Sequence, residues 1–470
     1  MRASRLHSGL RHTRAQRVRR APDSTRRRGN KTGRRADDIV PRRCQGGPRQ
    51  SVQGGVKVQI PAEAAPLLDF SPYRLLTEPE AVHRSMRAEP PVRYVREESG
   101  FSYWLISRYA EAREALGAPG LSNDPRRLGH AVDAHNAYSP MANNDPPDHT
   151  RLRRLVSHGF TRRRVAALEP EVDRIVDELL GDVGPSGRTD VIADLAFPLP
   201  VLVICALLGV PGRDRAALRT WAEHTLSTAV GPRTREERSR RLRTYFTRLI
   251  AAKRDAVRTA VPPDEQPDLL SALIAAQEQD NSLTDDELVG LAVLLLVAGH
   301  ETTTNLIGNG LLTLLLHPEQ LRLLLEEPQL LPTAVEELLR YEGSAGQSSL
   351  RVAVEDTLIG GTLIPRGSVV NIGLSLANRD PGVFPDSGTL DVRREPNPHL
   401  AFGHGIHFCL GAPLARMLAT AALGALLERF RGLALTVSPD ELRWRQISIL
   451  CGLTALPLSF DPVFRETSRT

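Results

Sequence analysis

The stretch Phe402-Gly403-His404-Gly405-Ile406-His407-Phe408-Cys409-Leu410-Gly411 decides how the rest of the chain is interpreted. It places a cysteine after a glycine-rich loop, which can turn tightly, and just before a helical pattern that continues to Phe430. A thiol at the start of a helix lies near unpaired N–H groups and the positive end of the helix dipole. This position predicts a pKa below the free value of about 8.5. Cys409 is therefore a candidate metal ligand or nucleophile.

Three interpretations of Cys409 compete. A buried structural cysteine accounts poorly for the glycines that flank it. A zinc site could use His399, His404, His407 and Cys409, but the chain has no second C-x-x-C or H-x-x-x-H partner of the kind that zinc sites favour. The third interpretation is haem iron held by one thiolate, which donates electron density and favours O–O cleavage. Gly411 would then let a flat, bulky group approach the backbone.

A second informative stretch begins at Thr284-Asp285-Asp286-Glu287, a capping box with acidic residues at the positive end of a helix. The helix that it predicts runs to His317 and has about 33 residues, or about 50 Å of length. A helix this long and apolar must cross the middle of a soluble protein.

The middle of this predicted helix carries an apolar face that ends in a hydroxyl group. Its members recur at helical spacing: Leu291, Leu294, Leu295, Ala298 and Thr302. Glu301 lies next to that hydroxyl. Gly299 and the run Thr302-Thr303-Thr304 predict a locally opened turn, because threonine hydroxyls bond back to carbonyls one turn earlier. An acid and an alcohol at such a turn can hold a water molecule and pass protons.

Taken together, these motifs resemble those of the cytochrome P450 family. The string from Phe402 to Gly411 matches the family's haem-binding signature, F-G-x-G-x-x-x-C-x-G, at every fixed position. Ala298-Gly299-His300-Glu301-Thr302 resembles its oxygen-activation motif, and Glu337-Leu338-Leu339-Arg340 resembles its E-x-x-R motif. The resemblance covers residues 61–470 and is closest to soluble bacterial members that act in secondary metabolism. It implies a mainly α, triangular fold with a small β portion, a long central helix and a thiolate loop.

The resemblance also implies how a cofactor, haem b, would be held. Cys409 would be the axial thiolate. Five residues of the haem-binding and oxygen-activation motifs would lie on either side of the cofactor: Phe402, Gly403, Gly411, Ala298 and Gly299. Two propionate carboxylates require cationic donors, and the residues in the family's positions for them are His149, Arg153, Arg351 and His399.

Two further groups of residues take roles from the resemblance. Thr302 and Glu301 would be catalytic and would deliver protons to bound dioxygen. Glu337, Arg340 and Arg394 would form a buried ion cluster that stabilises the loop of Cys409. Burying two arginines with one acid is acceptable only if their hydrogen bonds are complete.

The function implied is a haem-thiolate monooxygenase that inserts one atom of O2 into a small organic substrate, such as a polyketide or macrolide-like compound. The chain has no glycine-rich dinucleotide fingerprint, so electrons would come from a ferredoxin and its NAD(P)H-dependent reductase. Two alternatives stay open. One is a peroxide-dependent haem enzyme, against which the Glu301–Thr302 pair argues. The other is a non-catalytic haem- or metal-binding protein with a nucleic-acid-binding arm.

The composition sets the frame for these expectations. The chain has 470 residues, 41% of them hydrophobic, and a net charge of +6. Residues 1–50 contain 16 Lys and Arg against 3 Asp, which leaves a net charge of −7 for the rest. We therefore expect a disordered Arg-rich extension at 1–60 and a single catalytic domain at 61–470, and we do not expect a nucleic-acid partner for that domain. No stretch predicts a membrane span or a secretory signal, and four cysteines without C-x-x-C spacing favour a reducing, cytoplasmic location.

Secondary structure outside the motifs is predicted from periodicity and from turn residues. The run from Pro198 to Gly212 predicts a short buried helix. Short strands are expected at Arg351–Val354, 357–359, 362–364 and 368–372, separated by Gly and Pro turns. An irregular stretch should follow from Asn378 to Leu400. Apart from these strands, the pattern from Pro61 onward is mostly helical.

Overall fold

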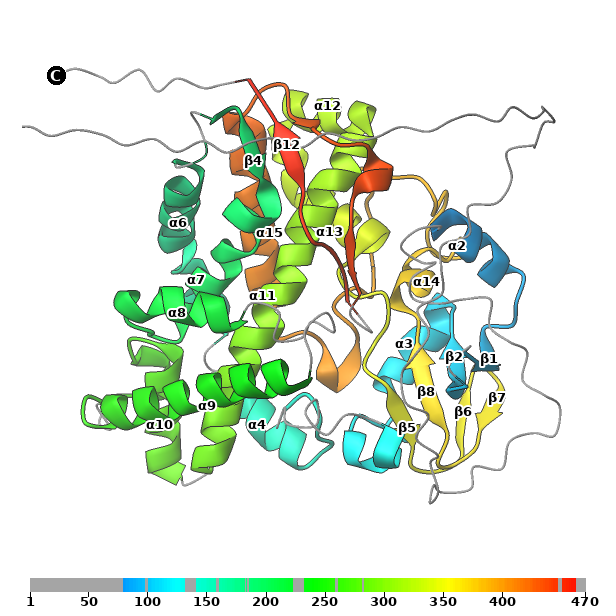
Figure 1. Ribbon diagram of the computed structural model, residues 1–470. Coiled ribbons are helices and arrows are strands. Elements are labelled where there is room, and N and C mark those ends of the chain that lie inside the picture. Colours follow the sequence, from blue (N-terminus) through cyan, green and yellow to red (C-terminus); the bar gives the residue numbers. More distant parts are fainter. Residues whose placement is uncertain are drawn as a thin grey trace, which may run out of the picture. The chain divides into compact units, whose positions relative to one another are not determined.

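A long buried helix, α11 (Asp285–Leu316), runs through the middle of the described residues (Figure 1). In this computed structural model the predicted capping box is present: the Thr284 hydroxyl accepts from the Glu287 N–H, and the Glu287 carboxylate accepts from the Thr284 N–H. The helix has 32 residues and is unbroken, so the predicted local opening near Gly299 is wrong. The hydroxyls of Thr302, Thr303 and Thr304 do bond back to the carbonyls four residues earlier, each at 2.9 Å.

The structure describes residues 79–97, 100–131, 141–157, 160–181, 183, 186–222, 232–257, 261–280, 283–446 and 450–461. All of them belong to one unit, residues 54–470. The expectation of a disordered extension at 1–60 lies outside the described residues.

Helices make up most of the described chain, which confirms the mainly α class. The other α-helices are α2 (Pro79–Arg87), α3 (Tyr109–Gly117), α4 (Asp148–Ser157), α5 (Arg162–Ala166), α6 (Glu169–Gly181), α7 (Pro198–Leu207), α8 (Gly212–Ala222), α9 (Pro232–Arg254), α10 (Leu269–Asp280), α12 (Pro318–Glu326), α13 (Leu331–Glu342), α14 (Leu374–Asn378) and α15 (Ala412–Arg429). Short helical turns are η1 (Pro125–Ala131), η4 (Ile192–Ala196), η5 (Pro263–Glu265), η6 (Pro328–Leu330), η7 (Gly405–His407) and η8 (Pro439–Glu441).

The β portion is small and is divided among four sheets. Its strands are β1 (Val92–Arg96), β2 (Ser102–Ile106), β3 (Leu121–Ser122), β4 (Arg188–Asp190), β5 (Arg351–Ala353), β6 (Thr357–Ile359), β7 (Thr362–Ile364), β8 (Val369–Ile372), β9 (Ala434–Leu435), β10 (Trp444–Gln446), β11 (Cys451–Leu453) and β12 (Pro457–Ser459). The largest sheet has the order β1-β2-β8-β5-β3, in which β2 and β8 are parallel and the other neighbours antiparallel. The remaining sheets are β4-β12-β9, β6-β7 and β10-β11.

The predicted strands after residue 350 are confirmed as β5 to β8, and the short helix after Pro198 as α7. The expectation of a mostly helical chain is confirmed, but the short strands at both ends of the described part were not predicted. Near the start, β1 and β2 form an antiparallel pair that joins β8, and near the end β9 to β12 form further pairs. These strands have two to five residues, too few to show a clear alternation in sequence.

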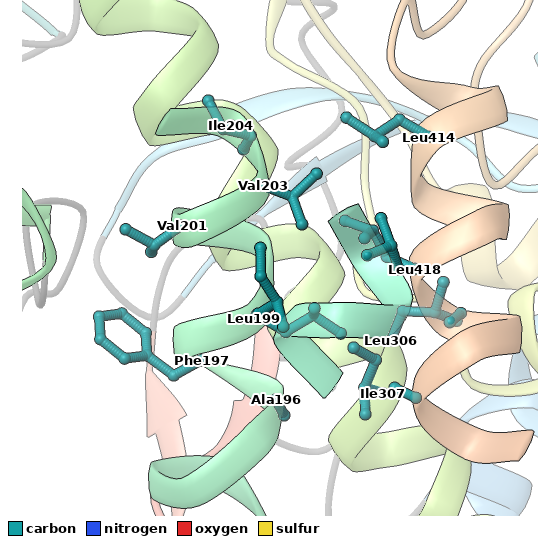
Figure 2. Close-up of a cluster of buried hydrophobic side chains, with 14 of the residues drawn as sticks. Ala196, Phe197, Leu199, Val201, Val203, Ile204, Leu306, Ile307, Leu414 and Leu418 are labelled. Carbon is teal, nitrogen blue, oxygen red and sulfur yellow. The ribbon is translucent and has the colours of Figure 1, made fainter. Parts of the chain in front are cut away.

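The core lies where η4, α7, α11 and α15 meet. Figure 2 shows its apolar side chains, among them Leu199, Val203 and Ile204, with Leu306 and Ile307 of α11 and Leu414 and Leu418 of α15. Gly299 explains how α7 comes so close to α11, because a Cβ there would lie 2.6 Å from the Ile204 side chain. Packing of this kind removes apolar surface from water, at about 25 cal/mol per Å².

The burial of α11 also bears on the expectation that no stretch of the chain spans a membrane. Contrary to that expectation, α11 is long and apolar enough by length and composition alone to cross a bilayer. In its most apolar 18-residue window, 61% is buried inside the protein. The helix packs against α7, α9, α13 and α15, so its apolar composition is that of a core helix.

Candidate active site

The loop that carries Cys409 is held in shape by its own backbone. The Cys409 N–H donates to the Phe402 carbonyl at 2.9 Å and so closes the loop. Gly403 and Gly405 have φ of +72° and +74°, a conformation that other residues rarely adopt. A Cβ at Gly405 would also lie 3.0 Å from the Leu116 carbonyl, so α3 is packed directly against this turn. The glycines predicted to permit tight turns are therefore required where they stand.

The thiol of Cys409 faces an internal cavity of about 400 Å³. Its side chain is exposed to this cavity while the surrounding protein buries it from bulk solvent. Burial raises the pKa of Cys409, although the N–H groups of Gly411 and Ala412 and the charges of Arg153 and Arg416 act to lower it. The expectation of a lowered pKa is therefore wrong: the helix-start amides are present, but burial outweighs them.

The cavity wall is mostly apolar. Its floor and sides come from α11, α7 and α15, including Leu294, Leu295, Ala298, Gly299, Thr302, Ile204, Leu207, Leu414 and Leu418. The loop after α13 adds a few polar groups, those of Ser344, Gln347, Ser348 and Ser349. Phe402, Gly403 and Gly411 also line it, so the structure brings together Cys409 and all five motif residues expected around the cofactor.

A cluster of basic side chains lies at one end of the cavity. His149 of α4 stacks on His407, with ring centroids 4.2 Å apart, and Arg153 and Arg351 line the same cavity. Burial lowers the pKa of Arg351 to about 10. It also lowers the pKa of His407 to about 4, with the charges of His149 and Arg351 adding to the effect. Basic side chains buried this close together suit a bound anion, which would offset the cost of burying their charges.

His399, expected among these cations, is not one of them. Its ring Nε2 lies 3.2 Å from Glu336 of α13, and its Nδ1 accepts from the Ala401 N–H at 3.2 Å. His407 takes the place expected for His399. From the sequence, His407 was named only as a possible zinc ligand and not as a partner of the cofactor's carboxylates, although it lies two residues before Cys409, in the same glycine-rich loop.

The structure brings together Glu337, Arg340 and Arg394 beneath the loop. Arg340 donates through Nε and Nη2 to both oxygens of Glu337 at 2.7 Å, and Arg394 Nε lies 3.1 Å from each. Arg340 also donates to the carbonyls of Asn378, Ser387 and Thr389. The Asp391 N–H and the Asn397 amide donate to Glu337 as well. This cluster meets the condition for burying such charges, because its donors are bonded.

Glu301 and Thr302 point in different directions from α11. Thr302 lines the cavity, and Ser344 donates to its carbonyl at 2.6 Å. Glu301 does not line the cavity: its carboxylate is buried and lies 3.1 Å from Arg445 Nη1. Adjacent helical residues point about 100° apart, which accounts for the separation of the two side chains.

The residues that line the cavity fit haem. His149 Nδ1 and Arg351 Nε are buried, and neither has a hydrogen-bond partner within the described part of the protein. They and their neighbours therefore suit a ligand with two carboxylates. At Gly411 a Cβ would enter the space beside the sulfur, 4.0 Å away, so the glycine leaves room for a flat group over the thiol. Zinc is not supported, since the described residues hold no cluster of three His, Cys, Asp or Glu.

A larger groove, of about 780 Å³, lies on the surface between α3 and β6. It is open to solvent and is bordered by Arg113, Glu114, Glu355 and Asp356. Cys409 is not among its lining residues, so the cavity that Cys409 lines is the candidate active site.

The fold, the thiol and the cationic end of the cavity together define a haem-thiolate protein. A family model of cytochrome P450 matches residues 230–451. The chain is 45% identical over 390 residues to the cytochrome P450 monooxygenase PikC of Streptomyces venezuelae, across 81% of this chain and 91% of that protein. It is 41% identical over 387 residues to 6-deoxyerythronolide B hydroxylase of Saccharopolyspora erythraea, across 79% of this chain and 92% of that protein.

Among solved structures, the tirandamycin C-bound P450 monooxygenase TamI is similar, with a TM-score of 0.73 and 39% identity, across 83% of this chain and 99% of that chain. The chain belongs to the cytochrome P450 family. It is a haem-thiolate monooxygenase that acts on a small organic substrate with O2 and redox partners.

Proposed function

We propose that this enzyme hydroxylates or epoxidises a polyketide-derived macrolactone. The observation that carries the proposal is the similarity, over about four fifths of the chain, to 6-deoxyerythronolide B hydroxylase, an enzyme named for such work. A further relative, mycinamicin IV hydroxylase/epoxidase of Micromonospora griseorubida, is 40% identical over 378 residues. The cavity suits a large, mainly apolar substrate with a few polar groups, because leucines line much of it and the loop after α13 adds hydroxyl and amide groups.

The electrons would come from a separate ferredoxin and its NAD(P)H-dependent reductase, in the cytoplasm. The overall reaction consumes O2, two electrons and two protons, places one oxygen atom in the substrate and releases the other as water. Bound haem would supply the activation of dioxygen. Cys409 would hold its iron, and His149, Arg153, Arg351 and His407 would hold its carboxylates.

Thr302 and Glu301 would handle the two protons. The Thr302 hydroxyl lies in the cavity wall and donates to the Ala298 carbonyl at 2.9 Å, so its oxygen is left as an acceptor within the cavity. Glu301, the residue that precedes Thr302, carries a buried carboxylate that can exchange a proton. When protons arrive too slowly, the two-electron product is hydrogen peroxide instead of water.

The experiment combines a spectrum with a turnover assay. The reduced protein should show a strongly red-shifted Soret band with carbon monoxide, and Cys409→Ala should lose it. With a ferredoxin, its reductase and NADPH, the enzyme should add one labelled oxygen atom from O2 to 6-deoxyerythronolide B. Oxidation of vitamin D3 or nocardicin C in place of any macrolactone would reject the substrate class. Equal turnover with hydrogen peroxide alone would favour the peroxide-dependent alternative.

Thr302→Ala should keep the haem spectrum and divert electrons into hydrogen peroxide. A positioned proton donor contributes about 10²- to 10⁴-fold to a step that needs it, so the peroxide fraction should become dominant. Peroxide formed per NADPH consumed is the measurement. Thr304→Ala is the matched control, because Thr304 makes the same 2.9 Å back-bond, to His300, and does not line the cavity. A Thr302 variant that forms no more peroxide than this control would contradict the role.

A further inference from the structure

The side-chain amide of Gln347 is buried in the cavity wall, and only one end of it is bonded. Gln347 belongs to the loop between α13 and β5, is 6% exposed and lines the same cavity as Cys409. Its Oε1 accepts from Asn371 Nδ2 of β8 at 2.8 Å, and Asn371 is itself 4% exposed. The other end of the amide, Nε2, is buried and has no hydrogen-bond partner among the described residues. Two N–H donors of Gln347 are therefore uncommitted.

A second buried glutamine shows what a complete set of bonds is. Gln277 of α10 is 9% exposed and is not among the residues that line the cavity. Its Nε2 donates to the Leu283 carbonyl and to Asp285 Oδ1, both at 2.9 Å, and its Oε1 accepts from Arg254 at 3.0 Å. A buried donor without a partner is costly, and native proteins contain few of them. The uncommitted donors of Gln347 therefore suit a partner that enters the cavity.

Two neighbouring hydroxyl groups of the same loop have already used their hydrogens. Ser344 Oγ donates to the Thr302 carbonyl at 2.6 Å, and Ser348 Oγ donates to the Ser349 carbonyl at 2.9 Å. A hydroxyl carries one hydrogen, so these two oxygens can only accept from a ligand. Of the buried side chains in this loop, Gln347 is therefore the one that offers donors to the cavity.

We propose that Gln347 determines specificity by donating a hydrogen bond to a carbonyl oxygen of the substrate, and that Asn371 is a positioning residue that holds the amide in place. The inference rests on the proposed function, in which the substrate is a macrolactone and so contains an ester carbonyl. A carbonyl oxygen only accepts, so it matches an amide N–H. The wall around this donor is mainly apolar. An analogue without the carbonyl leaves the donor unpaired there, so this one bond discriminates strongly.

The test uses three ring compounds that differ in one group: cyclododecanone, cyclododecanol and cyclododecane. Their dissociation constants are measured on the full-length haem enzyme, from the shift that each compound produces in the Soret band. Gln347→Met keeps the length of the side chain and removes its donors. It should weaken binding of the ketone by about fivefold to thirtyfold and leave binding of the hydrocarbon unchanged. Gln277→Met is the matched control and should keep the wild-type ratio of the two constants, because Gln277 does not line the cavity.

A variant of Asn371 separates positioning from binding. Asn371→Leu should weaken binding of the ketone by about threefold in the wild-type background and not at all in Gln347→Met, because Asn371 acts through Gln347. Equal ketone affinities for Gln347→Met and Gln277→Met would overturn the inference. So would a loss that falls on the alcohol in place of the ketone, since the amide would then present its oxygen. If a variant does not fold, the wild-type enzyme still decides, because a wall without a donor should favour the hydrocarbon over the ketone.

Oxidation of 6-deoxyerythronolide B distinguishes this failure from that of the proposed function. If the wild type oxidises this macrolactone and Gln347→Met binds the ketone as the wild type does, only the role of Gln347 has failed. If ketone binding depends on Gln347 and no macrolactone is oxidised, the macrolactone class has failed and the carbonyl donor stands.

Discussion

Arg351 is fixed in position by hydrogen bonds within the protein, while one of its donors remains available to a ligand. Its Nη1 donates to the carbonyls of Ala115 and Leu116, both at 3.2 Å, which fixes the guanidinium against α3. Its Nε is buried and without a hydrogen-bond partner among the described residues. A bound carboxylate would satisfy that donor and offset the burial that lowers the pKa of Arg351 to about 10.

Arg351→Gln should therefore weaken haem binding without unfolding the protein. A hydrogen bond between charged groups contributes about 1.5–3 kcal/mol, which corresponds to a loss of affinity of about tenfold to a hundredfold. The transfer of haem from the purified enzyme to apomyoglobin measures this. Arg366→Gln, at an exposed position before β8, is the control and should transfer haem at the wild-type rate. Equal rates for both variants would remove Arg351 from the cofactor site.

The sequence alone was sufficient to predict where a residue lies when its position depends on its immediate neighbours. Cys409 and its glycines lie in one loop, and Thr302 lies on the cavity side of a helix whose periodicity is readable. The partners of Glu301 and His399 were not accessible in this way. Arg445 is 144 residues from Glu301, and Glu336 is 63 residues from His399, so only the tertiary fold brings them together. The same distance in sequence explains why Arg445 was missed.

At the scale of elements, α13, α15 and the Cys409 loop are joined through Glu336. This residue of α13 receives hydrogen bonds from Arg416 of α15 at 2.6 and 2.7 Å, and His399 Nε2 lies 3.2 Å away. Burial alone would raise the pKa of Glu336, but the hydrogen bonds from Arg416 and His399 outweigh it and lower the pKa to about 2. The carboxylate therefore stabilises the fold when it is ionised.

Glu336→Gln should destabilise the protein at neutral pH, and the difference should disappear in acid. The folded pKa of about 2 is below the ordinary value of 4.5, so the contribution is present above pH 4.5 and lost as the pH falls toward 2. At pH 7 it amounts to about 3 kcal/mol, since each pKa unit is worth about 1.4 kcal/mol. Urea unfolding at pH 7, pH 4 and about pH 2.5 measures it, with most of the difference retained at pH 4 and little left at the lowest pH. Glu326→Gln, which breaks an exposed pair with Arg322, should cost less than about 1 kcal/mol at every pH.

The contact of the β10–β11 hairpin with α11 sets a second test at this scale. Gly452→Ala places a Cβ against Asn305, and this overpacking should cost about 1–3 kcal/mol in the free energy of unfolding. Gly212→Ala is the control, because a Cβ at the start of α8 meets nothing within 4 Å. Thermal unfolding of the two variants should show a lower midpoint for Gly452→Ala alone. A normal midpoint for that variant would mean that the hairpin can move away from α11 at little cost.

Helices and strands could be predicted from the sequence where strong local signals mark their ends or turns. The capping box at Thr284 and the acidic residues after it are enough to begin α11, and Gly-Gly at 360–361 is enough to turn between β6 and β7. In contrast, β2 pairs with β8, which lies far along the chain, and β1 joins the sheet by pairing with β2. Their formation depends on contacts that no local pattern records.

At the scale of the whole molecule, the charge is divided between two parts of the sequence. Residues 1–50 carry a net charge of +13 and the remaining residues −7. The similarity to other P450 enzymes covers about four fifths of the chain. We therefore propose that residues 61–470 contain the whole catalytic domain. The arginine-rich segment would then affect where the enzyme binds, through its charge, and leave turnover unaffected.

Removal of residues 2–50 separates these two properties. The shortened chain should keep its haem spectrum with carbon monoxide and turn over within about twofold of wild type, because no residue before Leu116 lines the described cavity. Its net charge changes from +6 to −7, so it should no longer be retained by an anionic matrix such as heparin. Salt-dependent elution of both forms, together with turnover, is the measurement. If turnover falls while the spectrum is unchanged, and excess ferredoxin restores turnover, the basic segment recruits the ferredoxin. If the spectrum is lost as well, the segment is part of the fold and the domain boundary at residue 61 is wrong.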